Sequence, residues 1–328
     1  MTLSTLSKKR RKNKKNKKVK KNKSARRKKT KRRKKKISRK GKKSKKVRFL
    51  KENCAPKHKN EVLPFTCYSK SSIQKLKDKW NLRHPDRQIT SDDEKTIWQN
   101  LKAAMSNTCN KESCWLKQII TDTDVDRKII DSFSPKAPDE WKSQPNTWLR
   151  SSDITKVMKQ YENKYPNFQF IGPSPIDYDT RVDDSNECVW NELCRFNLLD
   201  FLNQNINKIG IVFNLDPHYK GGSHWVALFI DTKKKSIYYF DSYSNKYEAV
   251  PNQIKKFVKT IQKQSESLNL NYEFYYNCKK HQYSNSECGM YCLYIIVKLL
   301  EGRNFHKLME NRIEDNIVFN LRQKYFNH

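Results

Sequence analysis

The chain has 328 residues, enough for one large domain or two smaller ones. Of its 70 Lys and Arg residues, 29 lie within residues 1–48, a segment without any Asp or Glu, and the remaining 41 are nearly balanced by 34 acidic residues. No apolar run reaches the roughly 18 residues that cross a bilayer, which excludes a membrane span. We therefore expect a mildly basic globular body that carries a polycationic arm.

The arm at 1–48 has almost no aliphatic side chains, so it cannot bury enough apolar surface to offset the entropy of ordering, and we expect it to be disordered. Its lysine and arginine runs suit nucleic acid, an anionic surface or nuclear import. Binding of this kind is independent of base sequence and weakens steeply with salt. The alternative is a solubilising tail that has no partner.

The nine cysteines contain no C-x-x-C pair, and their number is odd. The segment after Met1 lacks the apolar core of a secretory signal. We therefore expect free thiols in a protein from a reducing compartment. Spacings such as Cys109 to Cys114, without a nearby histidine pair, are weak evidence for zinc, and we predict no metal and no cofactor.

The first half of the body is expected to be helical. After a polar connector at 49–70, apolar spacing predicts helices within 71–82, 91–105 and 112–120. Three prolines between 134 and 146 indicate a linker or entry loop. We therefore assign 71–145 to a small helical lobe with its linker, and 146–328 to a second domain.

The second domain mixes both kinds of element, which indicates an α+β fold. Helices are predicted from about 150 to 161, and at 188–204, 252–265, 288–300 and 311–326. Strands are predicted at 167–171, where Gly172-Pro173 is expected to end the strand, and at 208–215, 225–230, 236–240 and 271–276.

The run from Cys288 to Leu300 is apolar on nearly every face, and a helix of that kind is normally buried. Cys288 then lies at the helix N-terminus, where unpaired N–H groups favour a thiolate. The plainer interpretation is a small core residue, the usual fate of a free cysteine.

A nucleophilic cysteine needs a base and a group that orients this base. His224 precedes the strand 225–230, and Asp241 follows the strand 236–240. If these strands form a hairpin, the start of one lies beside the end of the other, so His224 and Asp241 become neighbours. A carboxylate in that place fixes the tautomer of the imidazole. Each residue alone has an ordinary interpretation, as a loop histidine and as a turn-forming aspartate.

Other candidates are weaker. His218 lies in the loop before the glycines, and no carboxylate is expected opposite it. His281 is close to Cys288 in sequence, although a base usually comes from elsewhere in the fold. Cys292 falls one turn deeper on the apolar helix and is expected to be buried and inert, and Cys278 lies in a lysine-rich loop.

The order His224-Trp225, Asp241-Ser242, Gln282 and Cys288-Gly289 resembles the signature of clan CE cysteine proteases, which include the SUMO proteases and the adenovirus-type proteases. The segment 148–154 also resembles an element near the start of that catalytic domain. Glu287 departs from the family, which usually has Asp before the cysteine. The resemblance implies a central mixed sheet flanked by helices, with the nucleophile at the N-terminus of a buried helix.

The resemblance further implies a role for each matching residue. Cys288 is the nucleophile, His224 the base, Asp241 the group that orients it, and the Gln282 amide a donor to the oxyanion. Trp225 lines the substrate cleft. The family cleaves after glycine, often at Gly-Gly-x, and a narrow cleft under an indole admits a residue without a Cβ.

The helical lobe and the basic arm resemble those of polyprotein-processing proteases of large DNA viruses, of a mimivirus-like kind. This implies an endopeptidase that matures core or capsid precursors in the virion, with the arm holding it on packaged nucleic acid. One alternative is a protease that removes SUMO or ubiquitin-like modifiers in the host cytoplasm or nucleus. Another is an inactive nucleic-acid-binding virion protein, which the intact set of four residues disfavours. The oligomeric state is not predicted.

Overall fold

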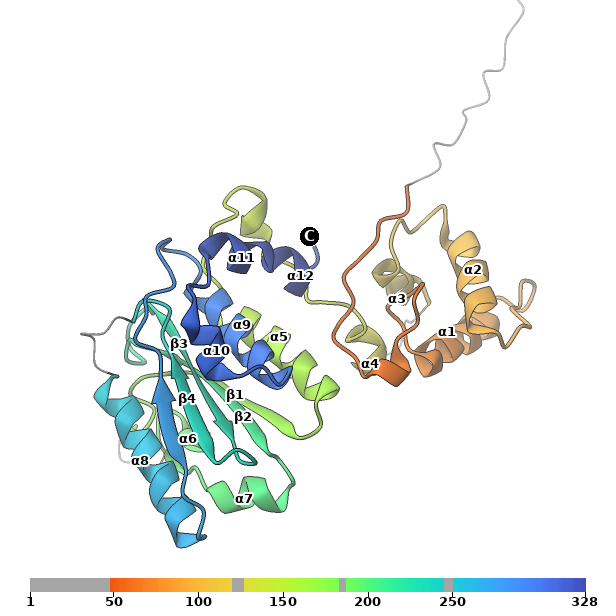
Figure 1. The fold of residues 1–328 in the computed structure, drawn as a ribbon. Coiled ribbons are helices and arrows are strands. Elements are labelled where there is room, and N and C mark those ends of the chain that lie inside the picture. Colours follow the sequence, from red (N-terminus) through yellow and green to blue (C-terminus); the bar gives the residue numbers. More distant parts are fainter. Residues whose placement is uncertain (1–47, 120–126, 183–186, 245–249) are drawn as a thin grey trace, which may run out of the picture. The chain divides into compact units, whose positions relative to one another are not determined.

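The computed structural model describes residues 48–119, 127–182, 187–244 and 250–328 (Figure 1). The predicted arm at 1–48 therefore lies outside the described residues except for Arg48. No helix among the described residues has the length and apolar character needed to cross a membrane.

The second domain is built on a five-stranded sheet with the strand order β1-β2-β3-β4-β5. The middle of the sheet is antiparallel, since β3 pairs with both β2 and β4 in this way, and the two edge strands run parallel to their neighbours. The strands are β1 (Phe168–Pro175), β2 (Lys208–Asn214), β3 (Trp225–Asp231), β4 (Ser236–Phe240) and β5 (Glu273–Tyr276). The sheet is therefore mixed, as predicted.

Both faces of the central strands are buried, and alternate residues enter two different cores. Ala227 and Phe229 of β3 pack in the core that contains α5 (Ser151–Lys164) and α9 (Cys288–Leu300). Val226 and Leu228 pack in the core that contains α8 (Asn252–Ser267). Helices on both faces explain why these strands consist of nearly continuous apolar runs.

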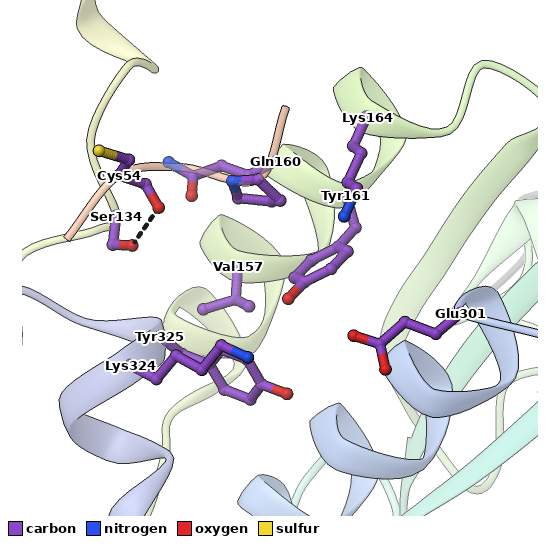
Figure 2. A pocket seen from close by; sticks show the side chains of 10 residues that line it. Cys54, Ser134, Val157, Gln160, Tyr161, Lys164, Glu301, Lys324 and Tyr325 are labelled. Carbon is purple, nitrogen blue, oxygen red and sulfur yellow. Dashed lines mark hydrogen bonds between the residues drawn. The ribbon is translucent and has the colours of Figure 1, made fainter. Parts of the chain in front are cut away.

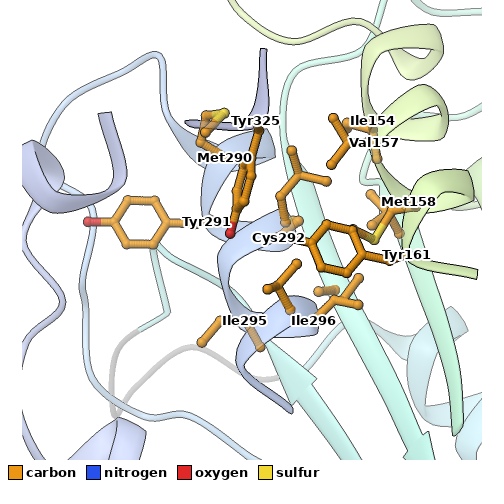
Figure 3. Close-up of a cluster of buried hydrophobic side chains, with 14 of the residues drawn as sticks. Ile154, Val157, Met158, Tyr161, Met290, Tyr291, Cys292, Ile295, Ile296 and Tyr325 are labelled. Carbon is orange, nitrogen blue, oxygen red and sulfur yellow. The ribbon is translucent and has the colours of Figure 1, made fainter. Parts of the chain in front are cut away.

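Helix α9 is buried along its length, as its sequence predicts. Figure 3 shows Val157 and Met158 of α5 near Cys292 and Ile296 of α9. Close packing of this kind permits little displacement of a helix. The start of α9 is therefore held by the core behind it.

The first half of the body has an apolar core of its own. Its helices are α1 (Lys70–Arg83), α2 (Glu94–Met105), α3 (Ser113–Ile119) and α4 (Arg127–Ile130), with a short 3₁₀ helix at Lys59–Glu61. A second 3₁₀ helix, Asp139–Lys142, contributes Trp141 to the core that contains α5 and α9. Asp93 caps α2 by accepting a hydrogen bond from the Thr96 amide. The prediction of a separate polar connector at 49–70 is wrong, because Cys67 and Tyr68 belong to the core of this lobe.

Three predicted elements of the second domain differ from the structure. Strand β1 continues to Pro175, because it is an edge strand that tolerates Pro173 and because its register shifts between Ile171 and Ser174. The helix predicted at 188–204 is two short helices, α6 (Asn191–Cys194) and α7 (Leu198–Asn203). Asn197 separates them, since its side chain caps α7.

The helix predicted at 311–326 is also interrupted. The chain forms α10 (Phe305–Glu310), α11 (Asp315–Asn320) and α12 (Arg322–Tyr325). The amide of Ile313 donates to Nδ1 of His281 at 3.0 Å, so this backbone donor is satisfied by a side chain and not by a helical carbonyl.

The expectation of free thiols is wrong for six of the nine cysteines. Disulfides join Cys54 to Cys67, Cys109 to Cys114, and Cys188 to Cys194. The free cysteines are Cys278, Cys288 and Cys292. Within the described part of the chain, no group of three or more His, Cys, Asp or Glu side chains is arranged to hold a metal ion.

Candidate active site

Cys288 is the first residue of α9 and is 2% exposed. Gly289 follows it, and a Cβ on this glycine would lie 3.1 Å from Leu149 Cβ and 3.3 Å from Trp225 Cδ1. The missing side chain therefore allows Leu149 and Trp225 to pack directly against the start of the helix. The unpaired N–H groups of this helix terminus favour negative charge at Cys288.

His224 and Asp241 form the pair that the hairpin predicts. Strands β3 and β4 are antiparallel, with Ala227 opposite Phe240, so His224 just before β3 lies near Asp241 just after β4. The imidazole Nε2 is 2.6 Å from Asp241 Oδ1, and only 13% of the histidine side chain and 10% of the aspartate side chain are exposed. The carboxylate therefore leaves Nδ1 as the nitrogen available to a thiol.

The charge state of His224 follows from these neighbours. Burial lowers the pKa of the imidazole, but the hydrogen bond to Asp241 and the nearby Cys288 sulfur outweigh it and raise the pKa from 6.5 to about 9. Nδ1 is buried and has no hydrogen-bond partner among the described residues. At neutral pH the site therefore favours an imidazolium beside the Cys288 sulfur.

Asp241 is itself held by residues that the sequence did not single out. The Tyr243 amide donates to its Oδ1 at 2.8 Å. The side chain of the buried Asn277 accepts a hydrogen bond from the Asp241 amide at 2.9 Å and donates to the Asp241 carbonyl at 2.8 Å. Asn277 follows β5, which runs parallel to β4, so the register of these strands determines the contact. No local pattern indicated it.

Gln282 is completely buried, and its amide orientation is fixed by its partners. Its Oε1 accepts from the Ser242 hydroxyl at 2.7 Å, so the Nε2 group is the donor that remains. Nε2 donates to the Ser284 carbonyl at 2.8 Å and to the Tyr243 hydroxyl at 3.3 Å. The tyrosine bond is the longer and weaker of the two, and the Tyr243 ring is 5.0 Å from the imidazole of His224. The amide hydrogen directed at Tyr243 is therefore the more weakly held of the two.

Trp225 begins β3 and is partly buried. Its indole N–H donates to the Leu149 carbonyl at 3.1 Å, which joins the strand to the segment before α5. Trp148, next to Leu149, leaves 43% of its surface exposed. Leu149 and Trp225 both approach Gly289, so Trp148 and Trp225 lie on the two segments that meet there. The sequence predicted only Trp225 as part of a cleft.

The two alternative bases, His218 and His281, lie in environments that differ from that of His224. The expectation that His218 has no carboxylate opposite it is wrong, because its Nδ1 is 2.7 Å from Asp177 Oδ2. This pair is more exposed than the His224 pair, with 45% of the His218 side chain accessible. His281 is buried, and burial together with Lys279 and Arg312 lowers its pKa to about 4.

The other free cysteines also differ from Cys288. Cys292 is buried, as predicted, and burial raises its pKa well above the ordinary value. Cys278 is exposed. Among the three free thiols in the described part of the chain, Cys288 is the one that contributes to the raised pKa of His224.

A cavity of about 180 Å³ lies elsewhere in the molecule (Figure 2). Its lining includes Tyr161 and Lys164 of α5 and Tyr325 of α12. None of the predicted site residues lines it, so this cavity is not the candidate active site.

Comparisons with known proteins show the family of the chain. The Ulp1 protease family, C-terminal catalytic domain, matches residues 145–328. A putative thiol protease of Acanthamoeba polyphaga mimivirus is 30% identical over 236 residues, which cover 71% of this chain and 75% of that protein. A cysteine protease of African swine fever virus (strain Badajoz 1971 Vero-adapted) is 24% identical over 265 residues, or 75% of this chain and 93% of that protein.

Among solved structures, the fold is similar to the crystal structure of a protease from African swine fever virus. The TM-score is 0.57 at 19% sequence identity, and the similarity covers 86% of this chain and 97% of that chain. This similarity confirms the predicted fold, a mixed sheet with helices on both faces. The chain belongs to the Ulp1 protease family, and it is a cysteine peptidase.

Proposed function

We propose that this protein is an endopeptidase that cleaves after glycine, at Gly-Gly-x sites, through an acyl-thioester on Cys288. The thiolate attacks the carbonyl carbon of the glycine, and the protonated His224 gives its proton to the leaving amine as the C–N bond breaks. His224 then takes a proton from water, which attacks the thioester. This step releases the carboxylate product and restores the thiolate.

The observation that carries this mechanism is the His224 environment. Its pKa of about 9 keeps the imidazole protonated at neutral pH, so it is ready to protonate a leaving group. Asp241 holds Nε2, which leaves Nδ1 for the sulfur and for the amine. These contacts support the assignment of His224 as the base and of Asp241 as the group that orients it.

Gln282 supports stabilisation of the oxyanion. Ser242 fixes the side-chain oxygen, so the amide nitrogen is the end of the side chain that can donate. Its weaker bond, to the Tyr243 hydroxyl at 3.3 Å, is the one that a negatively charged oxygen of the substrate would replace. The backbone N–H of Cys288, at a helix N-terminus, would be the second donor.

The preference for glycine rests on the packing over Gly289. A Cβ there would already be within 3.3 Å of Leu149 and Trp225, so the space beside the nucleophile is narrow. A substrate residue without a side chain passes such a constriction, and two consecutive glycines keep the chain thin on its approach. Trp225 and the exposed Trp148 would flank that segment of the substrate.

For the substrate, we favour viral core or capsid precursors. The similar relatives include a mimivirus thiol protease and a protease of African swine fever virus. A second candidate is removal of a ubiquitin-like modifier, because some relatives bear the name SUMO-1 cysteine protease. An inactive scaffold is disfavoured, since His224 lies 2.6 Å from Asp241 and the nearby Cys288 contributes to the raised pKa of this histidine.

The basic arm at 1–48 supports a location in the virion. Its 29 Lys and Arg residues would bind packaged nucleic acid by neutralising phosphates, in a manner that is independent of sequence. Such a tether keeps the protease near its precursors and does not itself take part in the chemistry. The host cytoplasm or nucleus is the alternative location if the protein removes modifiers.

The test offers the full-length protein a viral-type Gly-Gly-x peptide and a SUMO fusion side by side. Faster cleavage of the peptide supports precursor processing, and faster cleavage of the fusion supports removal of modifiers. Cleavage of neither, with the refolded disulfide-containing protein, contradicts the proposed activity.

A further inference from the structure

Arg322, the first residue of α12, is an arginine with only 2% of its surface exposed. Its guanidinium holds the Glu287 carboxylate with two hydrogen bonds, from Nε to Oε2 at 3.0 Å and from Nη2 to Oε1 at 2.9 Å. It also donates to two backbone carbonyls, from Nη2 to Ser286 at 3.2 Å and from Nη1 to Thr147 at 2.8 Å. The Trp141 ring covers the guanidinium at 4.4 Å.

A buried ion pair is expensive to desolvate, and apolar residues of similar size often stabilise a fold equally well. The pair is therefore weak evidence for a role in stability alone. Arginine differs from lysine in its rigid fork, which holds several acceptors in one fixed geometry. Here that fork joins α12 to two segments that are distant in the sequence, at Ser286-Glu287 and at Thr147. Both of these segments reach the candidate active site.

The first of these segments ends at the nucleophile. Glu287 is 1% exposed, immediately precedes Cys288 and is the N-cap residue of α9. Its Oε1 also accepts a hydrogen bond from the Ser286 hydroxyl at 2.8 Å. Because Arg322 binds both the side chain of Glu287 and the carbonyl of Ser286, it fixes the turn from which Cys288 emerges.

The second segment lies over the same helix start. Thr147, whose carbonyl accepts from Arg322, is two residues before Leu149. The Leu149 side chain is 3.1 Å from the position of a Cβ on Gly289, and its carbonyl accepts the Trp225 indole N–H. One guanidinium therefore sets both sides of the constriction beside the nucleophile.

We propose that Arg322 is a positioning residue that determines specificity, because it sets the separation between the start of α9 and the segment 147–149. This inference rests on the proposed cleavage after glycine and extends it to the residue that keeps the cleft narrow. An ammonium at position 322 cannot bind Glu287 twice and reach both carbonyls. The constriction then widens, and a substrate with alanine before the cleaved bond gains access.

The experiment measures kcat/KM for two peptides that differ only in Gly or Ala before the cleaved bond, in the wild type and in Arg322→Lys. One extra methyl group in a tight site is worth about 10–200-fold in kcat/KM, so we expect the Gly/Ala ratio to fall by about 10-fold or more in the variant. Partial unfolding lowers both rates equally and leaves the ratio unchanged. The ratio therefore separates positioning from stability.

Arg83→Lys is the matched control, because Arg83 also donates to two backbone carbonyls, those of Gln118 and Ile119, but in the helical lobe. Its Gly/Ala ratio should equal that of the wild type. If Arg322→Lys does not fold, as judged by circular dichroism, Glu287→Gln provides the same test with a side chain of equal size. An unchanged ratio in the folded variant overturns the role of Arg322. A wild type that cleaves neither peptide, or both equally, contradicts instead the proposed cleavage after glycine.

Discussion

Replacement of Asp241 by asparagine tests the electrostatics of the candidate site most sharply. The amide keeps the size of the carboxylate but removes its charge, so Nε2 of His224 loses the partner that lies 2.6 Å away. Burial, which lowers the pKa of the imidazole, remains unchanged. We therefore expect His224 to lose its proton at a much lower pH in Asp241→Asn than in the wild type.

The magnitude follows from the pKa of His224, which the folded protein raises from 6.5 to about 9. A shift of this size corresponds to about 3 kcal/mol. Because the folded-state pKa is the higher one, this contribution to stability is complete below about pH 6.5 and is lost as the pH rises through about 9. In Asp241→Asn, the part of this contribution that comes from Asp241 should disappear, and the part that comes from Cys288 should remain.

The assay is the pH profile of kcat/KM for a Gly-Gly-x peptide. We expect the alkaline limb of the wild-type profile near pH 9, and in the variant a limb displaced toward neutrality and a loss of kcat of about 10²–10⁴-fold at mildly alkaline pH. Asp177→Asn is the matched control, since it makes the same change beside His218. An alkaline limb that stays near pH 9 in Asp241→Asn, or that moves in Asp177→Asn, would refute this account of the base.

Three further predictions concern other parts of the molecule. Gln282→Ala should lower kcat by about 10²–10³-fold with little change in KM, the usual cost of one oxyanion donor, and an unchanged kcat would remove Gln282 from this role. Gly289→Ala should destabilise the fold by about 1–3 kcal/mol in thermal unfolding, because its Cβ meets Leu149 at 3.1 Å. Gly221→Ala, where a Cβ meets nothing within 4 Å, should not, and equal melting temperatures would contradict the packing argument. Deletion of residues 1–48 should abolish DNA binding at low salt while peptide hydrolysis persists, and DNA binding that survives the deletion would exclude the tether.

The part of the site that depends on local order was predictable from the sequence. The apolar run after Cys288 predicted a buried helix, and the two strands around residues 231–236 predicted the hairpin that brings His224 to Asp241. Both inferences use contacts between neighbouring elements, whose geometry is fixed by the periodicity of helices and strands.

Contacts between distant segments were not predictable in this way. Arg322 reaches Thr147 across 175 positions, and Asn277 reaches Asp241 because β5 pairs with β4 in parallel. A single sequence gives no register for such pairs. The disulfides were missed for a related reason, since composition and the absence of C-x-x-C spacing say nothing about which cysteines the fold brings together.

The central claim, that Cys288 is the nucleophile, is tested most directly by labelling the protein with a Gly-Gly peptide that ends in a thiol-reactive vinyl ester. Peptide mass mapping then locates the adduct. If exposure alone determined which thiol reacts, the reagent would label Cys278, which is exposed, and not Cys288, which is buried. If Cys288 is the nucleophile, the reagent labels Cys288 instead. We expect a single adduct on Cys288, retained in Cys278→Ser and lost in Cys288→Ala. An adduct on Cys278 alone, or labelling that persists in Cys288→Ala, would contradict it.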